Sequence, residues 1–153
     1  MRLDRQWIAR HIPQQGGMCL LDEVTGWDTG RILCRVGSHH DPGNPLRAHG
    51  RLAAVCGIEF AAQAMAVHGV LMTGADASAM RPRMGFLASV RGVEMLVDRL
   101  DNIEADLEVE AGRLAGDGNH ILYTFDVRAK GRLLLSGRAA VVLDAGRTSG
   151  HPS

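Results

Sequence analysis

One carboxylate stands in the most apolar part of the chain. Between Val55 and Val67 every residue is apolar or glycine except Glu59 and Gln63. An ionised carboxylate removed from water needs hydrogen-bond donors, or a function that uses the acid, because its burial is otherwise unfavourable. Gln63 follows Glu59 by one helical turn, so its amide can orient that carboxylate or bind a loop.

His49 supplies a second group that can move a proton. It precedes Glu59 by ten residues, in a flexible His-Gly pair that can fold over the same helix face. A histidine beside a carboxylate in an apolar cleft is a suitable acid and base pair near neutral pH. The sequence leaves two plainer readings open: a solvated loop histidine, and a Glu59 that only accepts hydrogen bonds from a loop or a neighbouring subunit.

Other chemistry has weaker support. His39, His40 and Asp41 resemble a metal-ligand cluster, but adjacent histidines in a strand point to opposite faces and no second Cys/His group follows at ligand spacing. We therefore expect no metal site. Cys56 lies on nearly the same helix face as Glu59, yet it has no flanking histidine, and we interpret it as a core residue. His68 and His120 are interpreted as packing or surface residues.

Composition limits the class of protein. With 153 residues, 46% of them hydrophobic and 22% charged, the chain fits one globular domain, which we place at residues 1–145 with a polar tail at 146–153. Lys+Arg and Asp+Glu each number 17, so the formal net charge is +0. No positive excess is available for nucleic acid or for an anionic membrane surface.

We expect a cytoplasmic protein with no membrane span. Three cysteines in apolar contexts, Cys19, Cys34 and Cys56, are typical of free buried thiols in a reducing compartment. The first fifteen residues are charged throughout and do not resemble a signal peptide. Glu59, Gln63 and His68 interrupt the apolar run, which is too short to cross a bilayer.

Hydrophobic periodicity predicts the elements. Helical spacing indicates a short helix before Pro13, and a long apolar run indicates a buried helix from Leu52 to about Thr73. A DTG turn predicts a hairpin between segments 18–27 and 31–36, followed by a loop over 38–51. A polar link covers 73–83, and four strands follow at 84–96, 103–114, 120–129 and 132–143.

This order predicts an α+β fold. A single, largely antiparallel sheet wrapped on the long helix buries one face of the sheet and most of the helix. Small domains of this kind leave sheet edges exposed, and dimers commonly cover such edges by pairing strands.

Three strings in the sequence resemble one known family. PQQGGMCLLDEV, NPLRAHGRLAAVCGIEFAAQAMAVHG and MGFLASVRGVEM are similar to the hotdog-fold 3-hydroxyacyl-[acyl-carrier-protein] dehydratases, in particular to a divergent bacterial branch of predicted dehydratases. The likeness runs from about Pro13 to Leu143. Its most specific part is the E-x-x-A-Q signature from Glu59 to Gln63.

The resemblance implies a hotdog fold, in which a long helix lies in a curved antiparallel sheet. Two chains, as a homodimer or a hotdog heterodimer, form one continuous sheet with active sites at the subunit interface. The implied substrate is a thioester of acyl carrier protein or CoA, with no cofactor. Water leaves a (3R)-3-hydroxyacyl thioester to give the trans-2-enoyl product.

The family's acid matches a residue of this sequence directly, whereas its base does not. Glu59 matches the helix acid that protonates or holds the departing C3 hydroxyl. The register of the family's base, which takes the C2 proton, falls on Pro45, and His49 is the nearest histidine. The family often has a histidine where this chain has Gln14.

The implied substrate-binding residues surround this pair. Backbone N–H groups at the helix start, at Ala54 and Val55, would hold the thioester carbonyl, and Ala54 replaces a glycine of the relatives. Gly85 and Phe86 match the strand that lines the acyl tunnel. Gln63 completes the implied substrate-binding set.

Three functions remain open from the sequence. The first is a dehydratase in fatty-acid or polyene-type biosynthesis. The second is a hotdog thioesterase in which Glu59 activates water, because the fold alone does not separate these chemistries. The third is a non-catalytic acyl-binding subunit that pairs with an active hotdog partner.

Overall fold

The computed structural model describes residues 2–13, 16–73, 85–117 and 119–143. The expected link at 73–83 falls outside these residues from position 74 onward, and so does the expected tail at 146–153. The helices are α1 (Arg5–His11) and α2 (Gly57–Thr73), and the single 3-10 turns are η1 (Gly16–Met18), η2 (Ser38–His40) and η3 (Ala54–Cys56). The strands are β1 (Glu23–Asp28), β2 (Arg31–Val36), β3 (Gly85–Met95), β4 (Leu107–Gly116), β5 (His120–Ala129) and β6 (Arg132–Leu143).

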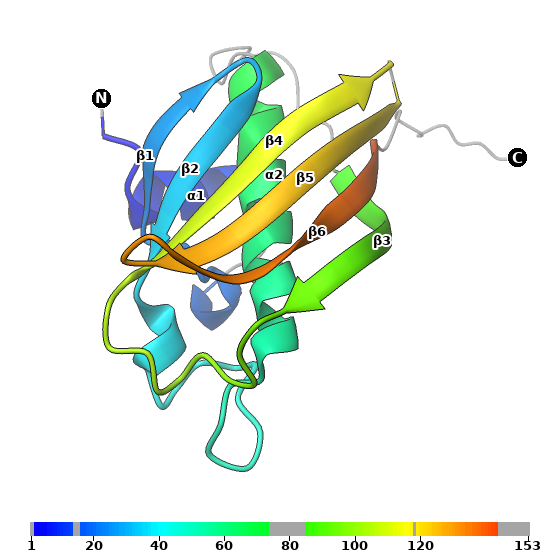
Figure 1. Ribbon diagram of the computed structural model, residues 1–153. Coiled ribbons are helices and arrows are strands. Elements are labelled where there is room, and N and C mark those ends of the chain that lie inside the picture. Colours follow the sequence, from blue (N-terminus) through cyan, green and yellow to red (C-terminus); the bar gives the residue numbers. More distant parts are fainter. Residues whose placement is uncertain (1, 14–15, 74–84, 118, 144–153) are drawn as a thin grey trace, which may run out of the picture.

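One antiparallel sheet curves around α2. Its strand order is β1-β2-β4-β5-β6-β3, and every adjacent pair is antiparallel. Figure 1 shows α2 lying across the concave face, with α1 beside the β1–β2 end. Along β5 alternate residues are buried against the helix, as a half-buried strand requires. The expected α+β architecture is confirmed, and it is the arrangement that the hotdog resemblance implies.

Helix α2 forms the core of the domain. The segment Ala54–Thr73 has a mean hydropathy of 1.5 and is long and apolar enough to cross a membrane by length and composition, so the expectation that this run is too short is wrong. In the fold it packs on the sheet, and its buried polar side chains, Gln63 and His68, are both hydrogen-bonded to other segments. These contacts identify it as a core helix.

The helix starts later than the sequence predicts, at Gly57 instead of Leu52. The backbone N–H of Leu52 donates to Asp101 Oδ1 and that of Ala54 donates to the Asp98 carbonyl, both at 2.9 Å. These long-range bonds hold the chain extended before the helix begins. A Cβ added to Gly57 would lie 2.8 Å from Leu135 Cδ2, so a glycine allows the helix start to approach β6 closely.

Strand β4 also begins later than expected, at Leu107 instead of Ile103. The preceding residues contain the bond from the Ile103 N–H to the Leu100 carbonyl, which turns the chain and breaks the ladder. Strand β1 begins at Glu23 instead of residue 18, because the chain first forms the 3-10 turn η1. The remaining strands match the predicted segments closely, including the tight turn at Lys130 and Gly131, where both φ angles are positive.

The sheet has two edges, β1 and β3. Strand β3 is the longer of the two and carries exposed apolar side chains at Leu87 (42%) and Met95 (50%). An unpaired edge with apolar side chains is a template for strand pairing. The β3 edge is therefore the surface of this chain best suited to a second sheet.

Close packing of β6 on its neighbours generates a first prediction. A Cβ at Gly137 would lie 2.8 Å from Phe125 Cζ and 3.2 Å from Val93 Cγ2. We expect Gly137→Ala to lower the free energy of unfolding by roughly 1–3 kcal/mol, because the buried Phe125 ring must shift. Chemical denaturation measures this. Gly26→Ala, where nothing lies within 4 Å of the added Cβ, is the matched control. Equal stability of the two variants would contradict the packing described.

Candidate active site

The centre of the site is a side-chain pair in the first half of α2. Gln63 Nε2 donates to Glu59 Oε2 at 3.0 Å and to the Met18 carbonyl at 2.8 Å. Gln63 Oε1 accepts the Leu20 backbone N–H at 2.9 Å. Gln63 is fully buried, while Glu59 is half-buried. The amide therefore uses both its N–H groups and its oxygen, and it leaves the second Glu59 oxygen available to another donor.

These bonds fix two segments at once. Met18 and Leu20 lie in the connection between α1 and β1, more than forty residues away in sequence. Gln63 thus holds this connection against α2 and orients Glu59 at the same time. The two uses of Gln63 that the sequence left open, orienting the acid and binding a loop, are both present in the geometry.

Only one of the two expected N–H donors at the helix start is free to bind a ligand oxygen. The Ala54 N–H donates to the Asp98 carbonyl at 2.9 Å, so in this chain it is already used. The Val55 N–H has no hydrogen-bond partner in the described part of the chain, and its side chain is 50% exposed. Since N–H groups at a helix start carry partial positive charge, Val55 is the better placed donor for an oxygen that gains negative charge.

A second set of contacts joins the helix start to the segment after β3. Arg99 donates from Nε to Asp101 Oδ1 at 3.0 Å, and its Nη2 bonds Oδ2 of the same carboxylate. The Leu52 N–H adds a third bond to Asp101, and the Arg99 guanidinium holds the pKa of Asp101 well below its ordinary value. Ala53 also forms a β-bridge with Arg99.

The structure does not bring His49 to Glu59 within one chain. His49 (φ 54°) and Gly50 (φ 74°) are the two central residues of a tight turn closed by two bonds between Ala48 and Arg51. His49 is exposed, and no hydrogen bond or ring contact joins it to Glu59 among the described residues. Figure 1 shows the loop that carries it projecting beyond the N-terminal end of α2.

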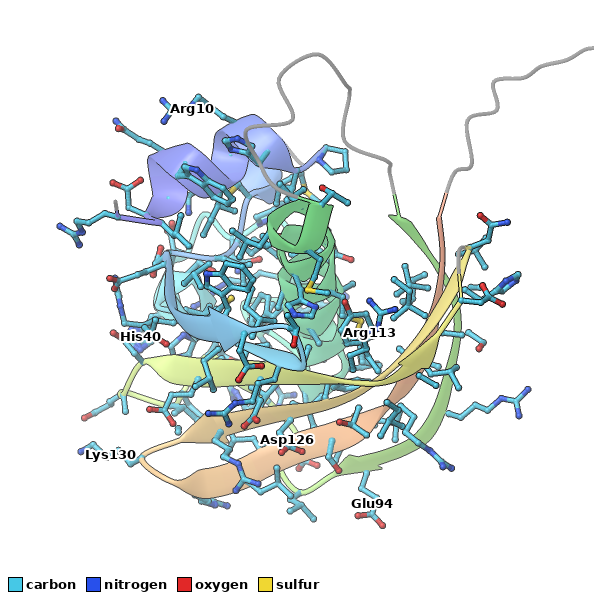
Figure 2. All side chains as sticks on the ribbon, turned by 90° about the horizontal axis from the view of Figure 1, so that it is seen from above. Arg10, His40, Glu94, Arg113, Asp126 and Lys130 are labelled. Carbon is cyan, nitrogen blue, oxygen red and sulfur yellow. The ribbon has the colours of Figure 1, made fainter. Side chains whose placement is uncertain are left out.

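The adjacent histidines do not form a metal site in the described residues, where no group of three His, Cys, Asp or Glu side chains is placed to bind an ion. They lie in the 3-10 turn η2 instead of a strand, so their rings meet edge to face with centroids 4.0 Å apart. His39 is buried and donates from Nε2 to the Ile103 carbonyl at 2.9 Å. Burial lowers its pKa. His40 lies at the rim of the molecule (Figure 2).

His68 has a structural role in the geometry. Its Nε2 lies 2.8 Å from the Asp28 carbonyl, which only accepts, so Nε2 carries the proton and Nδ1 accepts from the Tyr123 hydroxyl at 2.8 Å. Burial lowers the pKa of His68 and raises the pKa of Tyr123 to about 12. Arg113 extends from β4 toward the same side of the sheet as α2 (Figure 2). The buried pair of His68 and Tyr123 joins α2 to β5, and the bond from His68 to the Asp28 carbonyl joins α2 to the β1–β2 turn.

Gly85 and Phe86 form no hydrogen bond with Glu59 among the described residues. They open β3, opposite Leu143 and Val142 of β6. The other end of β3 is the one that leads into the segment bonded to the helix start. The structure therefore places Gly85 and Phe86 at the end of β3 opposite to the end that adjoins the helix start.

The three cysteines form no disulfide in the structure. Cys19 and Cys34 are buried and Cys56 is half-buried, and all three are free. Burial raises the pKa of each thiol. A raised pKa opposes thiolate formation, so none of the three has the environment of a nucleophile.

The fold and the helix carboxylate together define a hotdog-fold protein. The sequence matches the ApeP-like family, described as ApeP dehydratase, over residues 6–147. The chain belongs to this dehydratase family. No curated protein sequence matches it.

Solved structures of low sequence identity share the fold. The dehydratase heterocomplex ApeI:P from Xenorhabdus doucetiae matches with a TM-score of 0.78 and 22% identity, over 89% of this chain and 90% of that one. The thioesterase HI1161 from Haemophilus influenzae matches with a TM-score of 0.56 and 13% identity, over 79% and 76%. The TT0310 protein from Thermus thermophilus matches with a TM-score of 0.56 and 18% identity, over 78% and 89%. These likenesses confirm the hotdog fold.

Sequence reasoning missed the backbone partners of Gln63 and the whole Asp98–Asp101 segment. Met18 and Leu20 act through main-chain groups, which leave no residue-type signal. The polar string DRLD between two predicted strands was the available sign of the second set. This string does not indicate that the Asp101 carboxylate accepts the Leu52 N–H or that the Asp98 carbonyl accepts the Ala54 N–H.

The Gln63 contacts generate a second prediction. Gln63→Glu keeps an acceptor for Leu20 but replaces both N–H donors and places a second carboxylate beside Glu59. We expect a loss of roughly 2–4 kcal/mol in the free energy of unfolding at pH 7. The loss should shrink as the pH falls, because a carboxyl held protonated in the folded state binds more protons than in the unfolded chain.

Denaturation at several pH values measures this effect. Gln6→Glu makes the same chemical change at an exposed position of α1 and serves as the control. A Gln63→Glu variant that is as stable as the unmodified protein at pH 7 would show that the amide does not hold the carboxylate as described.

Proposed function

We propose that this chain takes part in the dehydration of (3R)-3-hydroxyacyl thioesters to trans-2-enoyl thioesters. The acyl group would be carried by an acyl carrier protein or CoA, in fatty-acid or polyene-type biosynthesis. The observation that carries the proposal is the half-buried Glu59 carboxyl, which Gln63 holds at the start of a core helix in a chain of a dehydratase family.

Each group has a role in the proposed step. A base takes the C2 proton, the Val55 N–H stabilises the negative charge that develops on the thioester oxygen, and Glu59 transfers a proton to the departing C3 hydroxyl. Water leaves as the C2–C3 double bond forms. Gln63 acts as a positioning residue for Glu59, since its buried amide has no donor left for a substrate.

His49 is the proposed base, acting on a site in an adjoining chain. Its exposure and its place on a tight turn beyond the helix start support this role. The β3 edge, with exposed Leu87 and Met95, supports pairing of two sheets. The second chain is a copy of this one or a different hotdog chain. The similar solved structure ApeI:P is a dehydratase heterocomplex, which favours testing both.

A second candidate is an acyl-binding subunit without its own turnover. The absence of a histidine contact to Glu59 within the described residues of one chain favours it. Assays of dehydration, of the reverse hydration, and of free-thiol release separate these functions. Thiol release without dehydration would indicate a thioesterase, and acyl binding with neither activity would indicate the subunit.

Substitution of the acid gives the third prediction. Glu59→Gln should preserve oligomerisation and reduce turnover by at least about a hundredfold, because proton transfer by a placed group contributes at least that much. His49→Ala should also reduce turnover. The assay follows enoyl thioester formation with the chain alone and with its hotdog partner.

Glu104→Gln is the matched control, because Glu104 is exposed and has no ion pair among the described residues. Full activity of Glu59→Gln would rule out its catalytic role. Full activity of His49→Ala would move the base to His39, His40 or water.

A further inference from the structure

An open groove of about 440 Å³ lies between the loop before α2, the segment after β3 and the start of β6. Three arginines line it, Arg51, Arg99 and Arg132, and they come from three separate segments: the loop before α2, the segment after β3, and the start of β6. Asp98 is the one carboxylate in the lining. Leu96 and Asn102 complete the walls together with neighbouring residues. The groove therefore gathers cationic side chains from distant parts of a chain whose net charge is +0.

Two of these arginines form no ion pair in the described part of the chain, although Asp98 lines the same groove. Arg51 and Arg132 are exposed, and neither side chain forms an ion pair or hydrogen bond within the described residues. Like charges that converge on one groove repel each other and attract an anion. An oxyanion with several acceptor oxygens is the ligand that best satisfies guanidinium groups arriving from different directions.

Arg99 lines the groove and is held in place by hydrogen bonds to Asp101. Its Nε and Nη2 bond Asp101, which leaves Nη1 for another acceptor. Asp101 is itself held by the Leu52 N–H at 2.9 Å. This geometry places one donor of the groove in a preset position, while Arg51 and Arg132 remain able to adjust.

The groove adjoins the proposed active site through the backbone. Arg51 closes the turn that presents His49, with bonds of 2.9 and 3.0 Å to Ala48. Three residues lie between Arg51 and Val55, so their α-carbons are at most about 14 Å apart. The Asp98 carbonyl in the groove wall accepts the Ala54 N–H. A phosphate bound by Arg51 would thus lie within reach of a pantetheine arm whose thioester lies at the helix start.

We propose that the Arg51–Arg99–Arg132 groove binds the phosphate of the phosphopantetheine arm that carries the acyl thioester. This inference rests on the proposed function and adds how the carrier is recognised. The phosphate belongs either to CoA or to the phosphoserine of a carrier protein, and both present the same group to the groove.

Binding measurements on the full chain, alone and with its hotdog partner, test the groove without turnover. Titration calorimetry compares 4′-phosphopantetheine with pantetheine, which lacks the phosphate. The unmodified protein should bind the phosphorylated compound at least about tenfold more tightly, since charge-assisted hydrogen bonds contribute on that scale. Arg51→Gln and Arg132→Gln should each remove most of this preference and leave pantetheine binding unchanged.

Arg10→Gln is the control variant. Arg10 is an exposed arginine of α1, which contributes no residue to the groove. In Figure 2 it lies on the opposite side of the molecule from the β5–β6 turn at Lys130. Its substitution should leave the preference intact. Circular dichroism confirms that each variant is folded.

Two results would overturn the proposal: phosphate preference that survives in both groove variants, or an unmodified protein without any preference. Loss of affinity for CoA alone or for the phosphopantetheinylated carrier alone in the variants identifies the source of the phosphate. A protein that prefers phosphopantetheine through these arginines but never dehydrates a 3-hydroxyacyl thioester would refute the proposed function and leave the groove assignment standing.

Discussion

The Gln63 amide is the constraint on which the site depends. A fully buried amide must find partners for its donors and its acceptor, and here those partners are the Glu59 carboxylate and two backbone groups of the α1–β1 connection. The same bonds that satisfy the amide therefore hold a carboxylate in an apolar helix. Glu59 is half-buried, and Gln63 bonds only one of its two carboxylate oxygens.

Contacts with β6 and with the segment after β3 fix the position of the start of α2. Gly57 lets the helix start approach Leu135 of β6, and the Asp98 carbonyl and Asp101 carboxylate fix the extended residues before it. In the proposed function, one chain supplies the Glu59 carboxyl, the Val55 N–H and the arginine groove. It does not supply a base in contact with the acid among the residues that the structure describes, which is why an adjoining chain enters the proposed mechanism.

Local patterns predicted most of the fold. Turn residues located β5, β6 and the β1–β2 turn, period-2 alternation located β4, and a long apolar run located α2 with Glu59 on it. The exact start of α2 and the late start of β4 were not predictable, because hydrogen bonds to distant residues decide them. For the same reason the sequence pointed to Gln63 but not to Met18 and Leu20, whose backbone groups carry no pattern.

The most direct test of the account is a structure of the chain, with its hotdog partner, bound to a non-eliminating amide analogue of a 3-hydroxyacyl pantetheine thioester. The measured quantity is the distance from the C3 hydroxyl oxygen of the analogue to the Glu59 carboxylate. The account predicts a hydrogen bond of about 3 Å while Gln63 still binds the other oxygen. A hydroxyl that lies out of reach of Glu59, with this carboxylate enclosed by protein groups alone, would contradict it.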